Sequence, residues 1–187
     1  ARNKVEVETL SESLKHKFPK AKIIGLATDI TDTDAVGLLL QEIKSEWGKL
    51  HILVNNVGMN IRKPAVDYSE AEISQILHTN LLSAYNLSMK CYPLMKGLQG
   101  SKSVVFVSSV AGLTHLKTGA IYAMTKAALN QLAKNLSVEW ATEQIRVNAV
   151  APWYISTPLA KTVLQNKQEN LQHNGITTGN SNKHSSQ

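Results

Sequence analysis

The sequence predicts an α/β fold in which a doubly wound parallel sheet carries helices on both faces. Short runs rich in β-branched residues alternate along the chain with longer segments whose apolar residues recur at helical spacing. Such alternation is typical of parallel strands joined by crossover helices. With 187 residues, 43% of them hydrophobic and 18% charged, the chain can form one medium-sized globular domain with a sizeable core.

Each element is expected where its local pattern is clearest. The expected strands are residues 23–27, 51–55, 103–108 and 145–150. The expected helices are residues 4–16, 32–47, 69–96 and 122–142. Thr31 or Asp32 is a natural N-cap for the second helix, and Pro93 is expected to break the helical register near the end of the third.

The last part of the chain differs in composition from the rest. From Gln165 onward apolar residues thin out, and Asn, Gln, Ser, His and Gly dominate. Such a segment cannot bury enough surface to offset the entropy lost on ordering. We therefore expect a catalytic domain over residues 1–164 and a polar, disordered tail over residues 165–187.

The formal net charge of +6 raises the alternative of a nucleic-acid-binding module. The excess is dispersed lysine, apart from one cluster between Lys15 and Lys22. No aromatic stacking pattern, zinc-ligand spacing or helix-turn-helix signature accompanies it, so a solvated helix end is the preferred interpretation. The same field would attract an acidic dinucleotide phosphate.

Other features limit the class of protein. No apolar run approaches the length of a membrane span, and no signal-peptide pattern opens the sequence. The single cysteine, Cys91, permits no internal disulfide and fits a reducing compartment, so we expect a cytoplasmic protein. No set of His, Cys, Asp and Glu has metal-ligand spacing, and we expect no metal site.

The most informative pattern is Ser109, Tyr122 and Lys126. Tyr122 and Lys126 are four residues apart on an expected helix, so they share a face, while Ser109 closes an expected strand. An ammonium about 4 Å from a phenol favours the phenolate by roughly 4 kcal/mol at an effective dielectric near 20. This set therefore predicts proton transfer to or from a carbonyl or alcohol oxygen. Tyr92 and Lys96 have the same spacing but no upstream strand-end serine.

Four further segments agree in order and spacing with the short-chain dehydrogenase/reductase family, particularly its tropinone-reductase-like members. They are residues 50–58, which end in Asn-Asn-Val-Gly; 79–81, Thr-Asn-Leu; 129–141, from Leu-Asn-Gln-Leu to Glu-Trp-Ala; and 145–152, Ile-Arg-Val-Asn-Ala-Val-Ala-Pro. The resemblance covers about residues 1–164 and implies a Rossmann-like NAD(P)-binding domain.

By this resemblance the chain is an NADP-dependent carbonyl reductase or alcohol dehydrogenase acting on a small ketone or alcohol. Tyr122 gives the proton, Ser109 polarises the carbonyl, and Lys126 favours the phenolate and holds the cofactor ribose. Asn80 holds a water that links Lys126 to solvent; a satisfied buried amide is the alternative interpretation of Asn80.

The resemblance also implies cofactor contacts along the chain. Arg2 binds the ribose 2′-phosphate and so selects NADPH, unless it is a solvated terminal arginine. Asp29 and Ile30 meet the adenine, although capping alone would explain the Asp29–Asp32 cluster. The remaining contacts are Asn56, Val57 and Gly58 beside the adenosine ribose, Tyr122 and Lys126, and Pro152, Ile155 and Thr157 near the nicotinamide. Trp153 stands where most members have glycine, and His115 either lines the substrate pocket or lies in a surface loop.

The sequence contains no Thr-Gly-x-x-x-Gly-x-Gly turn, which in the family cradles the pyrophosphate. Nor does it resemble the family's C-terminal part, so we expect the middle of a longer domain. In the family's strand order 3-2-1-4-5-6-7, the 23–27 strand would then have no neighbour. The alternative function is a non-catalytic fragment or pseudoenzyme that pairs with full-length subunits. Family members assemble through the helices at 69–96 and 122–142, so we expect a homo-oligomer.

Overall fold

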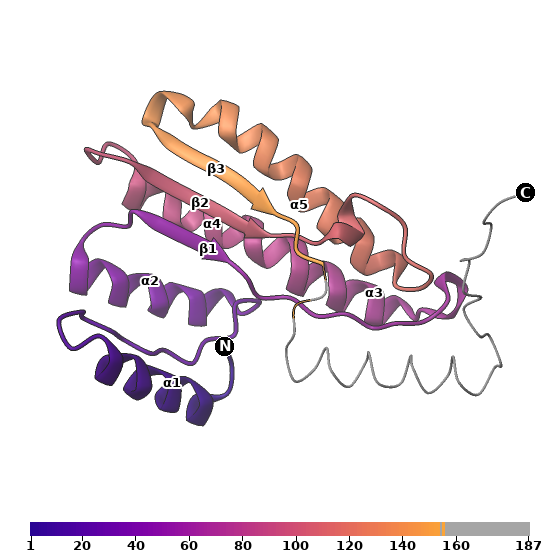
Figure 1. Ribbon diagram of the computed structural model, residues 1–187, viewed down its shortest axis with the longest axis horizontal. Helices are drawn as coiled ribbons and strands as arrows, with labels where there is room; N and C mark the ends of the chain where they lie inside the picture. Colours follow the sequence, from indigo (N-terminus) through magenta and orange to yellow (C-terminus); the bar gives the residue numbers. More distant parts are fainter. Residues whose placement is uncertain (154, 156–187) are drawn as a thin grey trace, which may run out of the picture. The chain divides into compact units, whose positions relative to one another are not determined.

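The computed structural model describes residues 1–153 and 155, and residues 1–152 form one compact unit. Its centre is a three-stranded sheet of β1 (Ile52–Asn55), β2 (Lys102–Val107) and β3 (Ile145–Val150), in the order β1-β2-β3 (Figure 1). Both pairings are parallel. This confirms the predicted α/β class. The expected boundary at residue 164 and the tail 165–187 lie outside the described residues.

Helical crossovers join the parallel strands, as parallel pairing requires. Between β1 and β2 the chain forms α3 (Glu70–Leu77), the π-helical turn η2 (His78–Leu82) and α4 (Ser83–Met95). Between β2 and β3 it forms α5 (Ala120–Glu139). These helices bring the ends of β1 and β2 to the same edge of the sheet, where the candidate site residues follow.

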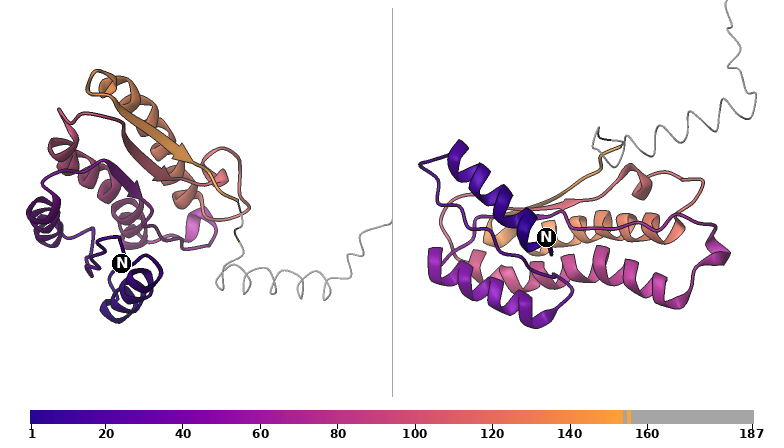
Figure 2. Two further views of the ribbon diagram at one scale, coloured as in Figure 1. Left: turned by 60° about the vertical axis from the view of Figure 1, so that its left-hand side comes forward. Right: turned by 90° about the horizontal axis from the view of Figure 1, so that it is seen from below.

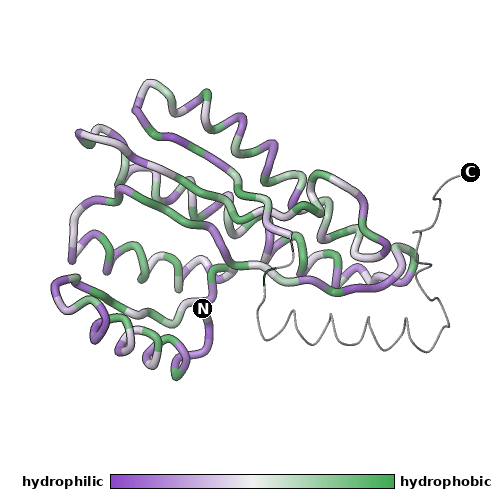
Figure 3. The backbone as a smooth tube through the Cα atoms, in the orientation of Figure 1, coloured by the Kyte–Doolittle hydropathy of each residue, from purple (hydrophilic) through white to green (hydrophobic). Residues whose placement is uncertain are grey.

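The core lies between the sheet and the helices α4 and α5. Leu53, Val104 and Val147 occupy matching positions on the three strands and are buried. Helix side chains pack onto them: Cys91, Met95, Leu129, Ala133, Leu136 and Trp140. Figure 3 accordingly shows continuous hydrophobic stretches on β1 and β2, whereas β3 alternates between hydrophobic and hydrophilic residues. This packing makes the sheet and α5 a firm support for residues at the strand ends.

Two further helices flank this core. Helix α2 (Thr33–Trp47) begins at its N-cap Asp32, whose carboxylate accepts from the backbone N–H groups of Asp34 and Ala35. Helix α1 (Lys4–Lys17) begins at Asn3 and lies on the other side of the strands from α2 and α4 (Figure 2, right). Helices thus stand on both sides of the strands, as the sequence predicts.

The strand expected at residues 23–27 is not formed. These residues have no strand partner. Next to them, the Thr28 N–H donates a hydrogen bond to the Ala1 carbonyl at 2.8 Å. A strand exists only through its ladder, and within residues 1–153 and 155 the strand β1 pairs with β2 alone. The prediction of a strand at residues 23–27 was therefore wrong. The family's strand order leaves this segment without a neighbouring strand.

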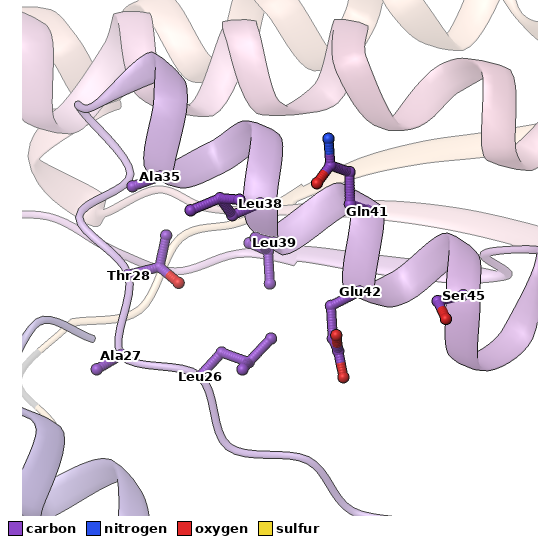
Figure 4. Close-up of a pocket in the computed structure, with 9 residues that line it drawn as sticks. All are labelled: Leu26, Ala27, Thr28, Ala35, Leu38, Leu39, Gln41, Glu42 and Ser45. Carbon is purple, nitrogen blue, oxygen red and sulfur yellow. The ribbon is translucent and has the colours of Figure 1, made fainter.

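An open groove of about 470 Å³ separates this unpaired segment from α2 (Figure 4). Leu26, Leu38 and Leu39 line it together with Glu42. Leu38 is 67% exposed, and Ile52 on β1 is 63% exposed. Apolar side chains and an unpaired strand edge at the surface favour association with other chains.

The helix expected over 69–96 is confirmed as a continuous helical segment from Glu70 to Met95, but with the π-helical turn inside it. The expected break at Pro93 was wrong, since Pro93 lies within α4. Its missing N–H removes one helical bond, and α4 ends two residues later, so the interruption is minor.

The basic cluster is a solvated helix end, as preferred from the sequence. Lys15, His16 and Lys17 form the last turn of α1, where positive charge interacts favourably with the helix dipole. All three are exposed. Within residues 1–153 and 155, no helix has both the length and the apolar character that crossing a bilayer requires.

Candidate active site

Ser109 lies two residues beyond the end of β2. It is the N-cap of the short 3-10 helix η3 (Val110–Gly112), and its hydroxyl accepts from the Ala111 N–H at 3.1 Å. The Val110 N–H donates to the Pro152 carbonyl at 3.1 Å, so the ends of β2 and β3 are joined here. Ser109 is therefore held by two strand ends while remaining half-buried.

Tyr122 and Lys126 lie on α5 as the spacing predicts. The Lys126 Nζ is 5.6 Å from the centroid of the Tyr122 ring. Lys126 is only 4% exposed, and its ammonium donates to the Val107 carbonyl at 2.6 Å. Burial lowers the pKa of Lys126 because removal from water disfavours the charged form. The end of β2 thus fixes the ammonium beside the phenol.

The pair Tyr92 and Lys96 shows why spacing alone does not make a site. The Lys96 Nζ is 5.9 Å from the Tyr92 ring, nearly the same geometry. However, Tyr92 packs on Trp140 with ring centroids 4.9 Å apart, and Lys96 forms an ion pair with Glu143 at 3.7 Å. The Lys96 side chain is 58% exposed, whereas Lys126 is buried. Environment, rather than spacing, distinguishes the two.

Asn80 lies on the π-helical turn and is fully buried. Its Oδ1 accepts from the Met59 N–H at 2.8 Å, and its Nδ2 donates to the Met59 carbonyl at 2.8 Å. The Nδ2 also donates to the Thr125 hydroxyl at 3.2 Å. The side-chain N–H groups are therefore fully used, and only a second lone pair of Oδ1 remains for another donor.

The space beside Gly58 bears on whether these residues fit a nicotinamide cofactor. A Cβ placed on Gly58 would lie 3.5 Å from the Lys126 Nζ and 3.5 Å from the Asn80 Oδ1. The absence of a side chain leaves this space open above the ammonium, so a ligand can approach the backbone closely. The residues present fit the ribose and nicotinamide end of such a cofactor.

Gly112 makes a second close approach, which the sequence reasoning missed. A Cβ on Gly112 would lie 2.6 Å from the Lys126 carbonyl carbon and 2.7 Å from the Ala127 nitrogen. Only a glycine lets the turn after Ser109 pack directly on the backbone of α5. A glycine shortly after a strand end is a signal of close backbone approach, and it could have identified this position.

Thr125 and Ser108 were also missed. The Ser108 hydroxyl donates to the Lys126 carbonyl at 2.9 Å, and the Thr125 hydroxyl donates to the Tyr122 carbonyl at 2.7 Å. Both residues are buried. A threonine three residues after a helical tyrosine can be expected to bond that carbonyl, but the contact of Thr125 with Asn80 requires the folded chain.

Arg2 and Asp29 lie together in a second group. The Arg2 Nη1 is 3.5 Å from the Asp29 Oδ2, and the Asp29 Oδ1 accepts from the N–H and hydroxyl of Thr31. Hydrogen bonds from Thr31, then the Arg2 charge, lower the pKa of Asp29. The carboxylate therefore stays ionised, and the largely exposed Arg2 side chain can turn toward another anion.

The remaining predicted residues are placed as follows. In the turn after β1, Asn56 and Val57 are exposed, while the preceding Asn55 donates to the Ser88 hydroxyl at 3.0 Å. Ile30 is half-buried, and His115 is exposed in a loop. Ile155 is 61% exposed but belongs to a second unit that begins at Trp153, and Thr157 lies outside the described residues.

Comparison with known proteins identifies the family. The family model for short chain dehydrogenase matches residues 1–168. The chain belongs to the short chain dehydrogenase family. It is 52% identical over 147 residues to a tropinone reductase homologue of Arabidopsis thaliana, an alignment covering 78% of this chain and 55% of that protein. A second, chloroplastic tropinone reductase homologue from the same plant is 44% identical over 170 residues, covering 90% of this chain and 52% of the relative.

Solved structures agree. L-sorbose reductase from Gluconobacter frateurii, determined with NADPH and L-sorbose, superimposes with a TM-score of 0.82 at 26% identity. The match covers 94% of this chain and 65% of that protein. The Rossmann-type fold and the resemblance to tropinone reductases are thus confirmed, and the family uses nicotinamide cofactors. The chain spans about half the length of the curated relatives that it matches.

Proposed function

We propose that the protein is an NADPH-dependent carbonyl reductase and that Ser109, Tyr122 and Lys126 carry its proton chemistry. The observation that carries this proposal is the buried Lys126 ammonium, held at the end of β2 and 5.6 Å from the Tyr122 ring centroid. An ordinary surface lysine would be screened by water, whereas a fixed, desolvated cation acts strongly on a neighbouring phenol.

In this proposal the three side chains divide the work on the carbonyl oxygen. Tyr122 gives its proton to the oxygen as the alkoxide forms, and Ser109 donates a hydrogen bond that polarises the carbonyl. Lys126 stabilises the phenolate left behind. The nicotinamide, when bound, supplies the hydride. The chain itself supplies orientation and charge, because its strand ends fix both Ser109 and Lys126.

Asn80 is proposed to complete a proton relay by holding a water beside Lys126. A water bridging these two groups would lie beside Gly58, because the Asn80 Oδ1 and the Lys126 Nζ are each 3.5 Å from where a Gly58 Cβ would stand. Because the Asn80 N–H groups are occupied, the water would donate to the free lone pair of Oδ1 and accept from the ammonium. If Asn80 is instead a purely structural amide, filling the space beside Gly58 should leave turnover unchanged.

Arg2 is proposed to select NADPH over NADH. Its guanidinium is largely exposed and pairs with Asp29 at 3.5 Å, a weak contact that a 2′-phosphate can replace. Asp29 and Ile30 would meet the adenine, and the residues of the Asn56–Gly58 turn would lie beside the ribose. The L-sorbose reductase structure, described as a complex with NADPH, supports this preference by analogy.

The substrate is proposed to be a small cyclic or aromatic ketone, or the corresponding alcohol. This proposal rests on the likeness to tropinone reductase homologues. Pro152, Ile155 and Thr157 are proposed to face the nicotinamide. We propose a cytoplasmic location, because the single cysteine, Cys91, is a buried free thiol, which fits a reducing compartment.

Self-association through α4 and α5 is also proposed. Large apolar side chains are exposed on η2, α4 and α5: Leu82, Tyr85, Met124 and Val138. A pair of helices that presents such residues to water favours a partner of the same kind. The second candidate function, a non-catalytic fragment that pairs with full-length subunits, is favoured by the unpaired edge of β1 and the open groove beside α2.

The test is NADPH oxidation with a panel of cyclic and aromatic ketones. It is run on residues 1–187 and on the same residues within a polypeptide of the relatives' full length. We expect turnover in the longer protein and its loss by about 10²–10⁴-fold in Ser109→Ala, since one precisely aimed donor is removed. Weak NADPH binding is expected for residues 1–187, which contain no glycine-rich turn. If the longer protein binds NADPH but reduces none of the ketones, and Ser109→Ala behaves in the same way, the non-catalytic alternative is favoured.

A further inference from the structure

Thr125 lies on α5 between Tyr122 and Lys126, and it is fully buried. Its hydroxyl donates to the Tyr122 backbone carbonyl at 2.7 Å and accepts from the Asn80 Nδ2 at 3.2 Å. A hydroxyl has one hydrogen, so its donor is used by the first contact while a lone pair serves the second. Thr125 therefore connects two separate elements rather than merely occupying the core.

The connection continues beyond Asn80. Both the N–H and the carbonyl of Met59 are bonded to the Asn80 side chain at 2.8 Å. Met59 directly follows Gly58, the residue beneath the open space beside Lys126. The hydrogen bonds thus run without interruption from the turn after β1, through the π-helical turn, to the first turns of α5. We name this chain of contacts through Met59, Asn80, Thr125 and Tyr122 the Asn80 clamp.

We propose that Thr125 is a positioning residue of the site: its hydroxyl fixes the start of α5 against the Gly58 turn and so sets where the Tyr122 phenol and the Lys126 ammonium stand. The inference rests on the proposed reductase function. It goes beyond that function because Thr125 is fully buried, presents no surface to a substrate or cofactor, and acts through the clamp.

Position matters because the effect of the ammonium on the phenol oxygen depends on their separation. Lengthening a phenolate–ammonium separation from about 4 to about 5 Å at an effective dielectric near 20 changes the proton equilibrium about fourfold, or roughly half a pH unit. Misplacement of reacting groups by about 1 Å can lower turnover about a hundredfold. A clamp that holds α5 in register therefore affects turnover and its pH dependence together.

The test compares Thr125→Val, which keeps the shape without the hydroxyl, with Thr125→Ser, which keeps the hydroxyl. Ser137→Ala is the matched control, because the Ser137 hydroxyl donates to the Lys134 carbonyl at 2.7 Å on the same helix, but Ser137 is only half-buried and this bond lies outside the clamp. Its loss removes the same kind of local bond without touching the clamp. Thr125→Ala replaces Thr125→Val if the latter does not fold, since it leaves room for water to pair with Asn80.

The first measurement is amide hydrogen exchange at Met59 in the chain without cofactor or substrate. The Met59 N–H is protected by Asn80, so a weakened clamp should accelerate its exchange. We expect an increase of about fivefold in Thr125→Val, equivalent to the loss of one ordinary hydrogen bond, and no change in Thr125→Ser or Ser137→Ala. Unchanged Met59 exchange in Thr125→Val would overturn the clamp, whatever reaction the protein performs.

The second measurement is the pH profile of turnover with NADPH and a ketone. Thr125→Val should lower kcat about ten- to a hundredfold, shift the profile by about half a pH unit and leave the ketone KM within about twofold. Thr125→Ser should have a kcat and a pH profile close to those of the unsubstituted protein. A wild-type kcat and profile in Thr125→Val would contradict the positioning role, as would equal changes in Ser137→Ala. Absence of turnover in the unsubstituted protein would instead refute the proposed function, which the Met59 measurement does not require.

Discussion

Replacing Gly112 by alanine should destabilise the protein and misplace Lys126. The added Cβ would lie 2.6, 2.7 and 2.9 Å from backbone atoms of Lys126 and Ala127, closer than real Cβ contacts come. Because these atoms belong to the backbone of α5, neither side can yield by a change of rotamer, and the turn or the helix must shift. Overpacking costs about 1–3 kcal/mol, and we expect about 3 kcal/mol here.

Gly37→Ala is the matched control for the same substitution. A Cβ on Gly37 meets nothing within 4 Å, and Gly37 lies inside α2. This alanine should therefore stabilise the protein by about 0.5–1 kcal/mol through helix propensity and a less flexible unfolded chain. Urea unfolding followed by circular dichroism compares the two variants. If Gly112→Ala proves as stable as Gly37→Ala, the packing of the Ser109 turn on α5 is not as tight as described.

Three further outcomes follow from the structure. The Lys63 ammonium, hydrogen-bonded to the Glu72 carboxylate, and then the Ser69 N–H lower the pKa of Glu72 to about 2. The stabilisation that the ionised Glu72 gives the fold should therefore be present above about pH 4.5 and be lost as the pH falls toward 2. Glu72→Gln should flatten this part of the stability–pH curve, and an unaltered curve would contradict the ion pair. Burial raises the pKa of Cys91 to about 11, so a disulfide reagent at pH 8 should modify the thiol only as fast as the protein unfolds, and rapid native-state labelling would refute this. Arg2→Ala should weaken NADPH binding about ten- to a hundredfold and NADH binding little in titration calorimetry, whereas equal losses would exclude a 2′-phosphate contact.

The paired strands and the helices around them were predictable because their patterns are local. Residues 145–150 form β3 with the predicted bounds, and the helix expected at 122–142 is α5, which begins two residues earlier. The 23–27 segment was mispredicted because strand formation depends on neighbours, which a local pattern does not contain. Pro93 was misjudged because its position relative to the helix end, not its presence, decides its effect.

The site was predictable only in part, for the same physical reason. Tyr122 and Lys126 are related by helix periodicity, which a sequence shows directly. The contact between Asn80 and Thr125 spans 45 residues, and the packing of Gly112 on α5 depends on how a turn meets a helix. Such contacts exist only in the folded chain. The sequence therefore indicates which residues do the chemistry more readily than which residues hold them in place.

The most direct test of the account is turnover in Tyr122→Phe beside Tyr92→Phe, in a polypeptide of the relatives' full length that binds NADPH. Both tyrosines have a lysine four residues on with its Nζ within 6 Å of the ring centroid, so the variants differ in environment rather than in spacing. We predict that Tyr122→Phe lowers kcat by about 10²–10⁴-fold and that Tyr92→Phe leaves kcat near the wild-type value. A folded Tyr122→Phe protein that keeps most of its turnover would contradict the assignment of Tyr122 as the proton donor.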